Sequence, residues 1–405
     1  MVRMERYRLR LLILVTVLSG MSQGLLLPML TLLQAKAGVA SGLNGLSAAA
    51  MYLGTSAAMF FVEAPLCRFG YKPVIAAGLL VVGGAALLFP LWSPIWFWSL
   101  LRILIGVGDS SLHYCTQLWI IASSPPGQRG KRIALYGMAY AIGFSIGPSG
   151  MHLARLSTWL PFYAISALLV ICFLLLLRMQ NAFPGEEREE EENEREKKLE
   201  GAPAPRNRYI QAIGIGWFAL LPSLLYGYME SSMNSNFPLY GLKLGLSDAW
   251  IATLLPAIGL GSLVLQIPLG ALSDRGNRKL VLMIAGFLGA CAFLAIPSTE
   301  NPWVLLILLG LAGGLVGSFF SLGLAYLADL LPRRLLPAGN AIASLNFSIG
   351  SLMGPSAGGF GMQYLAPGSM FAFIGGGFLL FSLLGCVHRS KNPSPHSVHS
   401  MKEGM

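Results

Sequence analysis

Apolar runs of about 20 residues recur along the whole chain, and they constrain the fold more than any other feature. The 405 residues are 55% hydrophobic and only 11% charged, whereas soluble globular proteins carry about 25% charged residues. Twelve such runs lie at residues 11–33, 44–66, 73–91, 95–123, 132–154, 158–178, 209–239, 249–272, 279–297, 302–328, 338–362 and 368–387. The sequence therefore predicts an all-α membrane protein with twelve transmembrane helices.

Positive charge lies almost entirely on one side of the predicted spans. Of the 28 Lys and Arg residues, 24 fall in the two tails and in alternate loops. The other four are Lys36, Arg155 and Lys243 in the opposite loops and Arg102 inside a span. Because Lys and Arg are retained in the cytoplasm, both termini are expected there, in a multi-pass protein of the cytoplasmic (inner) membrane. The net charge of +10 does not predict nucleic-acid binding, since the positive residues form no contiguous basic face.

One long hydrophilic segment divides the chain. Residues 181–208 hold nine of the 18 acidic residues and are flanked by Pro and Gly, which predicts a charged, partly helical cytoplasmic linker. It separates two six-helix bundles, residues 1–180 and 209–388, and residues 389–405 form a cytoplasmic tail. The first apolar run follows a basic N-terminus, as in a signal peptide. It exceeds a signal-peptide core in length, so we expect it to be retained as the first membrane helix.

The two predicted bundles are related in sequence. A shift of 207 residues without gaps superposes Gly20 on Gly227, Gly38 on Gly245, Gly54 on Gly261, Arg68 on Arg275 and Lys72 on Lys279. Internal repeats of this size build many transporter folds. The repeat therefore predicts two bundles with the same internal packing.

The same helix-breaking pattern occurs once in each bundle, as GFSIGPSG (143–150) and GSLMGPSAGG (350–359). Glycines spaced by three and four form a face that lets helices approach closely, and proline bends a helix. We expect a paired bend at the seam where the two bundles pivot or seal, formed by Gly143, Gly147 and Pro148 and by Gly350, Gly354 and Pro355. The letters FSIG also recur at a shift of 203, which we interpret as coincidence because independent positions support 207.

Three motifs resemble those of the major facilitator superfamily. The loop after the eighth span, GALSDRGNRK (270–279), is similar to the family signature G-x-L-x-D-R-x-G-R-K, with Asn277 in place of a glycine. The fourth span carries an R-x-x-x-G-x-G pattern from Arg102, and the fifth carries G-x-x-x-G-P-x-x-G, which is associated with the proton-linked drug-efflux antiporter branch. The resemblance covers nearly the whole chain. It implies two pseudo-twofold-related six-helix bundles that alternate access.

The resemblance also implies a cytoplasmic gate. In the family, the Asp of the signature caps a neighbouring helix and pairs with Arg when the cytoplasmic side is closed. The matching residues are Gly270, Asp274, Arg275 and Arg278 in the second half and Arg68 and Gly70 in the first. Cys67 replaces the Asp in the first half, so that latch is weakened or uses Glu63. The alternative is that these charges only set topology.

A polar stripe marks the fourth span. Arg102, Asp109, His113 and Gln117 are spaced by 7, 4 and 4 residues, which places them on one helix face. Ionisable groups within a membrane are candidates for function. We interpret Asp109, with Arg102 and His113, as a proton and substrate site. The alternative is an Asp–Arg or Asp–His pair that only holds helices together.

A second candidate group lies on the seventh span. Glu230 matches Gln23 of the first span at the 207-residue shift, and the resemblance implies that both face a central cavity. Asn234 lies one turn beyond Glu230, and Asn346 is a polar residue of the eleventh span. Glu230 is predicted to carry protons or contact substrate. Gln23, Asn234 and Asn346 have the alternative role of interhelical hydrogen bonding.

These features predict a secondary active transporter with alternating access and proton-coupled export of small amphipathic or drug-like molecules. Lipid or lysolipid flipping and proton-coupled solute uptake are alternatives on the same fold. A polytopic membrane enzyme is disfavoured, because no metal-ligand cluster or nucleophile elbow occurs. No phosphate-binding G-x-x-x-x-G-K-[ST] loop occurs either, so the proton gradient is the expected driving force and no cofactor or metal is expected. We expect a monomer in the bilayer, and we interpret the five scattered cysteines as packing residues.

Overall fold

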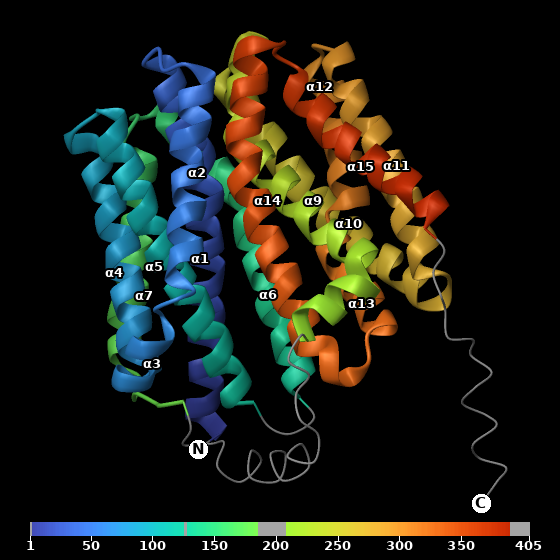
Figure 1. Ribbon diagram of the computed structural model, residues 1–405. Coiled ribbons are helices and arrows are strands. Elements are labelled where there is room, and N and C mark those ends of the chain that lie inside the picture. The colour runs from blue at the N-terminus through green and yellow to red at the C-terminus, as the bar shows by residue number, and fades with distance from the viewer. Residues whose placement is uncertain (1, 125–127, 185–207, 389–405) are drawn as a thin grey trace, which may run out of the picture.

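The computed structural model describes residues 2–124, 128–184 and 208–388, which form a bundle of long helices (Figure 1). The first half contains α1 (Val2–Lys36), α2 (Ser41–Ala58), α3 (Glu63–Phe69), α4 (Tyr71–Leu88), η1 (Phe89–Leu91), α5 (Ile95–Ala122), α6 (Arg129–Ile146), η2 (Gly147–Arg155) and α7 (Leu160–Leu177). The second half contains α9 (Arg208–Lys243), α10 (Asp248–Arg275), α11 (Arg278–Ala295), η3 (Ile296–Ser298), α12 (Pro302–Val316), α13 (Phe319–Leu330), η4 (Arg333–Leu335), α14 (Leu336–Tyr364) and α15 (Ser369–Val387).

Each of the twelve predicted spans coincides with a helix or a consecutive helix pair. Nine described spans are long and apolar enough to cross a membrane, or ten if α2 and α3, which meet at 53°, are counted together. The two other crossings are α6 with η2 and α14. These carry the Gly-Pro motifs; Arg129, Lys131 and Arg132 lower the hydropathy of α6, and glycine, serine and proline residues lower that of α14.

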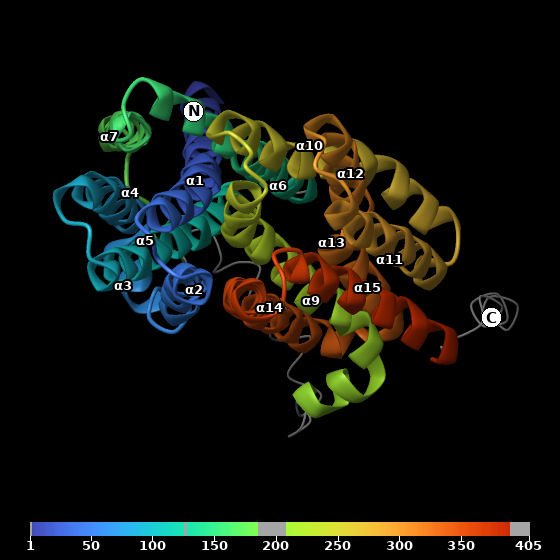
Figure 2. The same cartoon turned by 90° about the horizontal axis from the view of Figure 1, so that it is seen from above.

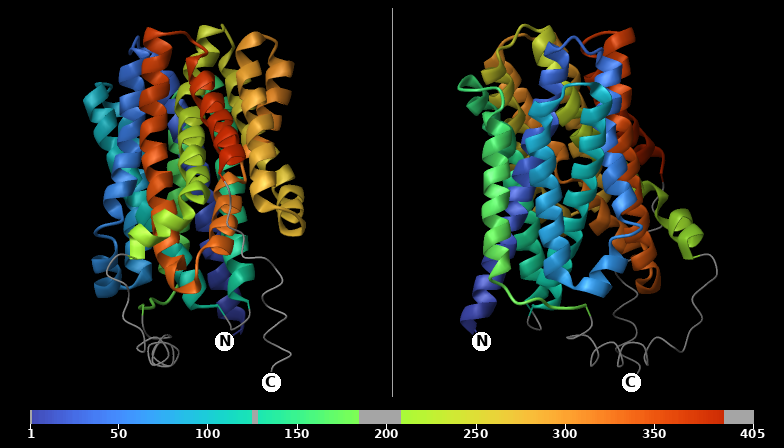
Figure 3. Two further views of the ribbon diagram at one scale, coloured as in Figure 1. Left: turned by 45° about the vertical axis from the view of Figure 1, so that its right-hand side comes forward. Right: turned by 90° about the vertical axis from the view of Figure 1, so that its left-hand side faces the viewer.

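The two halves lie side by side. Seen from above, α1 to α7 gather on one side and α9 to α15 on the other (Figure 2). The halves contact each other where α2 packs on α14, α1 on α9, and α10 on α6 and η2. We call the end of the bundle where α1 begins the terminal face and the opposite end the far face (Figure 3). Most of the predicted linker and all of the predicted tail lie outside the described residues.

Close helix contacts repeat with a shift of 207 residues. A Cβ on Gly20 would lie 2.6 Å from the Tyr140 carbonyl oxygen, and a Cβ on Gly227 would lie 2.3 Å from that of Phe347. Three further pairs of contacts are related by the same shift. In each pair a glycine faces a backbone carbonyl: Gly54 with Ile103 and Gly261 with Gly310, Gly106 with Met51 and Gly313 with Ile258, and Gly143 with Val17 and Gly350 with Leu224. Since both residues of each contact in one half are offset by 207 residues from those in the other half, the predicted register is confirmed and the 203-residue match of FSIG is coincidental.

Gly143, Gly147, Gly350 and Gly354 pack inside their own halves, so the expectation that these four form the seam is wrong; Gly359 of the second motif does meet α2, at Ser41. Gly143 and Gly147 lie against Val17 and Met21 of α1, and Gly350 and Gly354 occupy the matching places against α9. The reason is steric, because only glycine lets two helix backbones of one bundle approach this closely.

The prolines lie at the seam, and the backbone around them differs between the two halves; the paired bend stays a prediction. The α-helix of α6 ends at Ile146, and a 3₁₀ segment with Pro148 near its start continues the span. In contrast, α14 remains α-helical through Pro355. Pro148 lines a cavity between the halves, and a Cβ on Gly45 of α2 would lie 2.2 Å from the Pro355 carbonyl oxygen.

Candidate functional site

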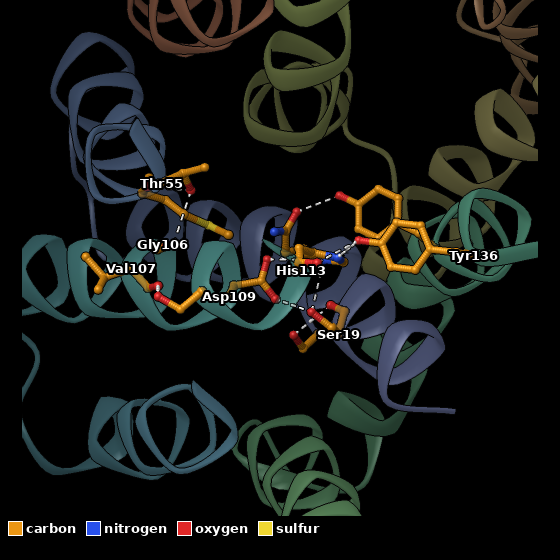
Figure 4. A network of polar contacts seen from close by, with 12 residues as sticks. Ser19, Thr55, Gly106, Val107, Asp109, His113 and Tyr136 are labelled. Atoms are coloured by element: carbon orange, nitrogen blue, oxygen red, sulfur yellow. Dashed lines mark hydrogen bonds and ion pairs between the residues drawn. The ribbon is translucent and has the colours of Figure 1, made fainter. Parts of the chain in front are cut away.

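Asp109 lies at the junction of three helices of the first half (Figure 4). Its side chain is fully buried on α5, and the Ser19 hydroxyl of α1 donates to its Oδ1. Ser19 Oγ is also 3.1 Å from His113 Nε2, and Nε2 is 3.6 Å from Asp109 Oδ2. On its other side, His113 Nδ1 lies 2.8 Å from the Tyr136 hydroxyl of α6. The four side chains form one continuous polar chain.

Arg102 does not pair with Asp109, so the alternative of an Asp–Arg pair that only holds helices together is wrong, while a role of Arg102 in proton or substrate binding stays a prediction. Seven residues along a helix span about 10 Å, so the two side chains share a face without reaching each other. Arg102 is 1% exposed, and its three guanidinium nitrogens have no hydrogen-bond partner among the described residues.

Along the predicted stripe of α5, the side chains become more exposed from Asp109 to Gln117. Asp109 is buried, His113 is partly buried, and Gln117 is exposed. Each step along this series is one helical turn toward the terminal face. Gln117 forms none of the polar contacts described for Asp109, so it belongs to the stripe but not to the Asp109 cluster.

Glu230 lies in the wall of a cavity between the two halves. The cavity has about 670 Å³ of empty space including its open side, and its walls come from α6, η2, α9, α10 and the start of the α12–α13 turn. The Tyr226 hydroxyl donates to Glu230 Oε1 at 3.3 Å, and Asn234 Nδ2 donates to the Glu230 carbonyl oxygen at 2.8 Å. Most of the remaining lining is apolar or aromatic, including Phe144, Met229, Met233, Leu255, Ile258 and Leu263.

Tyr140 connects the two candidate groups. Its ring meets that of His113 edge-on at 4.6 Å, and it lines the same cavity as Glu230. Its hydroxyl donates to Gln23 Oε1 at 2.8 Å. Gln23 therefore contacts Tyr140, and no direct bond to Glu230 is formed. Asn346 donates to the Leu220 carbonyl oxygen at 3.2 Å, which is the interhelical role given above as its alternative.

Sequence reasoning missed Ser19 and Tyr136. The sequence does contain a spacing that relates each of them to another polar residue on the same helix face. Ser19 lies one turn before Gln23 on α1, and Tyr136 lies one turn before Tyr140 on α6. Serine and tyrosine are common in membrane helices, however. Only the contact between helices identifies these two.

The signature loop of the second half is held by Arg278. Its side chain bonds to Asp274 at 3.0 Å and to Asp329 at the end of α13 at 3.2 Å. Asn277, which departs from the family signature, caps α11 by accepting from the Leu280 amide. Asp274 caps no helix here, and Arg275 is exposed. A Cβ at Gly270 would meet no atom within 4 Å.

The matching loop of the first half is organised by Gly70 and Lys72. Gly70 has φ of +82°, and a Cβ there would lie 2.6 Å from the Ala182 carbonyl oxygen. Lys72 Nζ donates to the carbonyl oxygens of Leu177 and Met179 at the end of α7, where a cation is favoured by the helix dipole. Its repeat partner Lys279 donates to the His388 carbonyl oxygen at the end of α15.

Arg68 and Glu63 do not form a latch with each other. Both are exposed, and the Arg68 guanidinium lies 5.2 Å from the centroid of the neighbouring Phe69 ring. Neither residue forms an ion pair among the described residues, so a latch through Glu63 is not formed in this structure.

Polar contacts join the halves near the far face. Lys36 at the end of α1 pairs with Asp248 at the start of α10. The Gly42 amide donates to Gln363 Oε1 at 2.9 Å, which connects the start of α2 to the end of α14.

The cysteines only partly match the packing role expected of them. Cys115 and Cys172 are buried, but Cys67, Cys291 and Cys386 are exposed, and all five are free thiols. Within the described ranges, no group of three or more His, Cys, Asp or Glu side chains is arranged to hold a metal ion.

Comparison with known families decides the identity of the fold. A family model described as Major Facilitator Superfamily matches residues 12–263 and 249–404. The chain belongs to the major facilitator superfamily. It is thus a multi-pass membrane transporter, and proteins of this superfamily are not enzymes.

Relatives in bacteria cover most of the chain. The chain is 37% identical over 376 residues to YfkF of Bacillus subtilis (strain 168), which is described as an MFS-type transporter. The aligned region covers 92% of this chain and 93% of the relative. It is 26% identical over 342 residues to YcaD of Escherichia fergusonii, described likewise, covering 81% and 82%.

Solved structures of two superfamily transporters share the fold. A mutant of the nucleoside transporter NupG superposes with a TM-score of 0.74 at 11% identity, covering 94% of this chain and 99% of that one. A bacterial homolog of the human lysosomal transporter Spinster, inward-facing and occupied, gives 0.69 at 14% identity, covering 97% and 99%. These likenesses concern the fold alone.

Proposed function

We propose that this protein exports small amphipathic molecules in exchange for protons. The observation that carries the proposal is the placement of two carboxylates, Asp109 and Glu230, one in each half of the molecule. Both lie within spanning helices, and within the described residues neither forms an ion pair with Lys or Arg. Glu230 lines the cavity, and Tyr140, which lines it too, packs on His113 beside the buried Asp109.

An unpaired carboxylate is costly inside a membrane protein, and binding a proton removes that cost. Asp109 is sealed among Ser19 and His113, so proton uptake is its main way to lose charge. Glu230 is open to the cavity, where either a proton or a positively charged group of a substrate can neutralise it. The two sites thus supply the competition that exchange transport requires.

The cavity walls favour amphipathic substrates. Large apolar and aromatic side chains surround a few polar groups, which is the usual composition of a site for small organic molecules. Glu230 and Asn234 provide the polar contacts. A molecule with an apolar body and an amine matches this arrangement.

The proposed orientation places the terminal face in the cytoplasm, because the positive residues concentrate there. With the contacts of Lys36 and Gly42 joining the halves near the far face, the cavity would then open inward. The predicted linker and tail would be cytoplasmic.

A second candidate function is lysolipid transport. The observation that favours it is the buried, unpartnered guanidinium of Arg102, which an anionic head group would neutralise. In this case an anionic lysolipid would be transported, and Arg102 would be needed for its binding.

The test begins with a thermal-shift screen of purified protein against amphipathic drugs, lysolipids and polar metabolites. The compound with the largest shift is then followed in inverted vesicles with an imposed pH gradient and no ATP. We expect transport that a protonophore abolishes, and a loss of about a hundredfold or more in Asp109→Asn and in Glu230→Gln while both variants still insert. A transport rate that the protonophore leaves unchanged, or wild-type rates in both variants, would contradict the proposal.

A further inference from the structure

We propose that Ser19, His113 and Tyr136 form a proton relay between Asp109 and water on the terminal side. The inference rests on the proposed function, because it assumes that Asp109 carries the transported proton. It assigns roles to Ser19 and Tyr136, which the sequence did not indicate. Ser19 and Tyr136 each have one hydroxyl proton, and His113 has two ring nitrogens.

With Asp109 ionised and His113 neutral, the direction of every bond is fixed. The one hydroxyl proton of Ser19 goes to Asp109 Oδ1. The contact between Ser19 Oγ and His113 Nε2 at 3.1 Å then requires Nε2 to carry a proton and donate it. Nδ1 is left bare and accepts from the Tyr136 hydroxyl at 2.8 Å.

With Asp109 protonated, the whole chain can reverse. Asp109 donates to Ser19, Ser19 donates to Nε2, and the proton of the ring now lies on Nδ1, which donates to Tyr136. The Tyr136 hydroxyl also has a second acceptor within reach, because its oxygen is 3.3 Å from the His113 carbonyl oxygen. Both states therefore satisfy the same four groups with the same contacts.

Transfer between the two states balances. Hydronium on the terminal side gives a proton to the Tyr136 oxygen while the Tyr136 hydroxyl proton moves to His113 Nδ1. The Nε2 proton moves to Ser19 Oγ, and the Ser19 hydroxyl proton moves to Asp109 Oδ1. Each intervening group gains one proton and loses one, hydronium becomes water, the carboxylate becomes a carboxylic acid, and nothing is oxidised or reduced.

The relay leads from a sealed site toward an accessible one. The side chain of Asp109 is 0% exposed and that of His113 is 20% exposed, while Tyr136 is partly buried. Gln117 follows on the same face one turn further and is exposed. Without the relay, no described polar group joins buried Asp109 to that side.

The other titratable groups near the relay do not replace it. The Tyr140 ring packs on His113, but its hydroxyl bonds to Gln23. Arg102 lies two turns from Asp109 toward the far face, and Cys115 is buried. None of these three bridges Asp109 to the terminal side.

The experiment follows protonation of Asp109 directly, without a substrate. Full-length protein in liposomes is subjected to a rapid fall in pH, and the C=O stretch of the protonated carboxyl is recorded by time-resolved infrared absorption. The Asp109 signal is the difference between wild type and Asp109→Asn. We expect Ser19→Ala and Tyr136→Phe each to slow its appearance by about tenfold or more.

Ser22→Ala is the matched control, because the Ser22 hydroxyl is equally buried on α1 but donates to the Ser19 carbonyl oxygen. It should leave the rate within about twofold. Ser19→Thr, which keeps the hydroxyl, should restore it, whereas a purely structural effect of Ser19→Ala would not follow the hydroxyl. Wild-type rates in both Ser19→Ala and Tyr136→Phe would overturn the relay. A missing difference between wild type and Asp109→Asn would instead refute Asp109 as a proton carrier, which is a failure of the proposed function.

Discussion

The two halves have the same backbone packing but different chemistry. Helices α1 and α6 meet at the same glycines as α9 and α14, displaced by 207 residues. The polar stripe of α5 has no counterpart, however, because Leu309, Val316 and Phe320 of the second half stand where Arg102, Asp109 and His113 stand in the first. Ionisable groups can therefore differ between the halves as long as the glycine contacts are kept.

The polar residues of α1 and α9 show the same division. Ser19 and Gln23 correspond to Tyr226 and Glu230. In the first half Ser19 donates to a sealed carboxylate on another helix and Gln23 accepts from Tyr140, whereas in the second half the carboxylate itself occupies the second position and lines the cavity. Under the proposed function, this difference separates a site for protons from a site for substrate.

Substitutions that exchange Arg102 of α5 and its repeat-related residue Leu309 of α12 should have the largest effect on stability. Leu309→Arg would place a charge in a fully buried position, at a cost of about 3 kcal/mol or more, so we expect loss of folded protein in the membrane. Arg102→Leu should do the opposite and raise the melting temperature, because it removes a buried charge without a partner. Yield and thermal unfolding in detergent measure both. A lower melting temperature in Arg102→Leu would mean that Arg102 is stabilised by a contact in the folded protein.

The glycine contacts should respond equally in the two halves. A Cβ at Gly143 would lie 2.0 Å from Val17 O, and one at Gly350 would lie 2.1 Å from Leu224 O. We expect Gly143→Ala and Gly350→Ala each to destabilise by about 1–3 kcal/mol through overpacking. Gly84→Ala is the control, since a Cβ there meets no atom within 4 Å. A large effect in only one half would contradict equivalent packing.

The smallest expected difference lies at the ends of the last helix of each half. His388 corresponds to Asn181, and burial, with a further contribution from the charge of Lys279, lowers the pKa of His388. The folded state thus favours the neutral ring. A small stability contribution is present above the ordinary histidine pKa of about 6.5 and is lost as the pH falls below it. His388→Asn should remove that dependence, and thermal unfolding of both proteins between pH 5 and 8 would show it. Identical pH profiles would contradict the assignment.

The sequence predicts the architecture well because its signals are periodic. Span lengths and the 207-residue register come from residues close in sequence or related by one constant shift. The site is predicted less well, because it depends on which helices face each other. Spacing places Arg102 and Asp109 on one stripe but does not show that Ser19 of another helix takes the place of Arg102. The Gly-Pro motifs likewise indicate close packing, but the sequence does not show whether the partner lies in the same half.

The most direct test of the division between the halves measures proton and substrate movement together. Wild type, Asp109→Asn and Glu230→Gln are reconstituted in liposomes that contain a pH-sensitive dye, and the compound selected by the thermal-shift screen is supplied down its gradient. We predict that wild type moves protons in the direction opposite to the compound. In Asp109→Asn the compound should still move down its gradient, but without proton movement. In Glu230→Gln neither the compound nor protons should move. Proton movement coupled to the compound in Asp109→Asn would contradict the account.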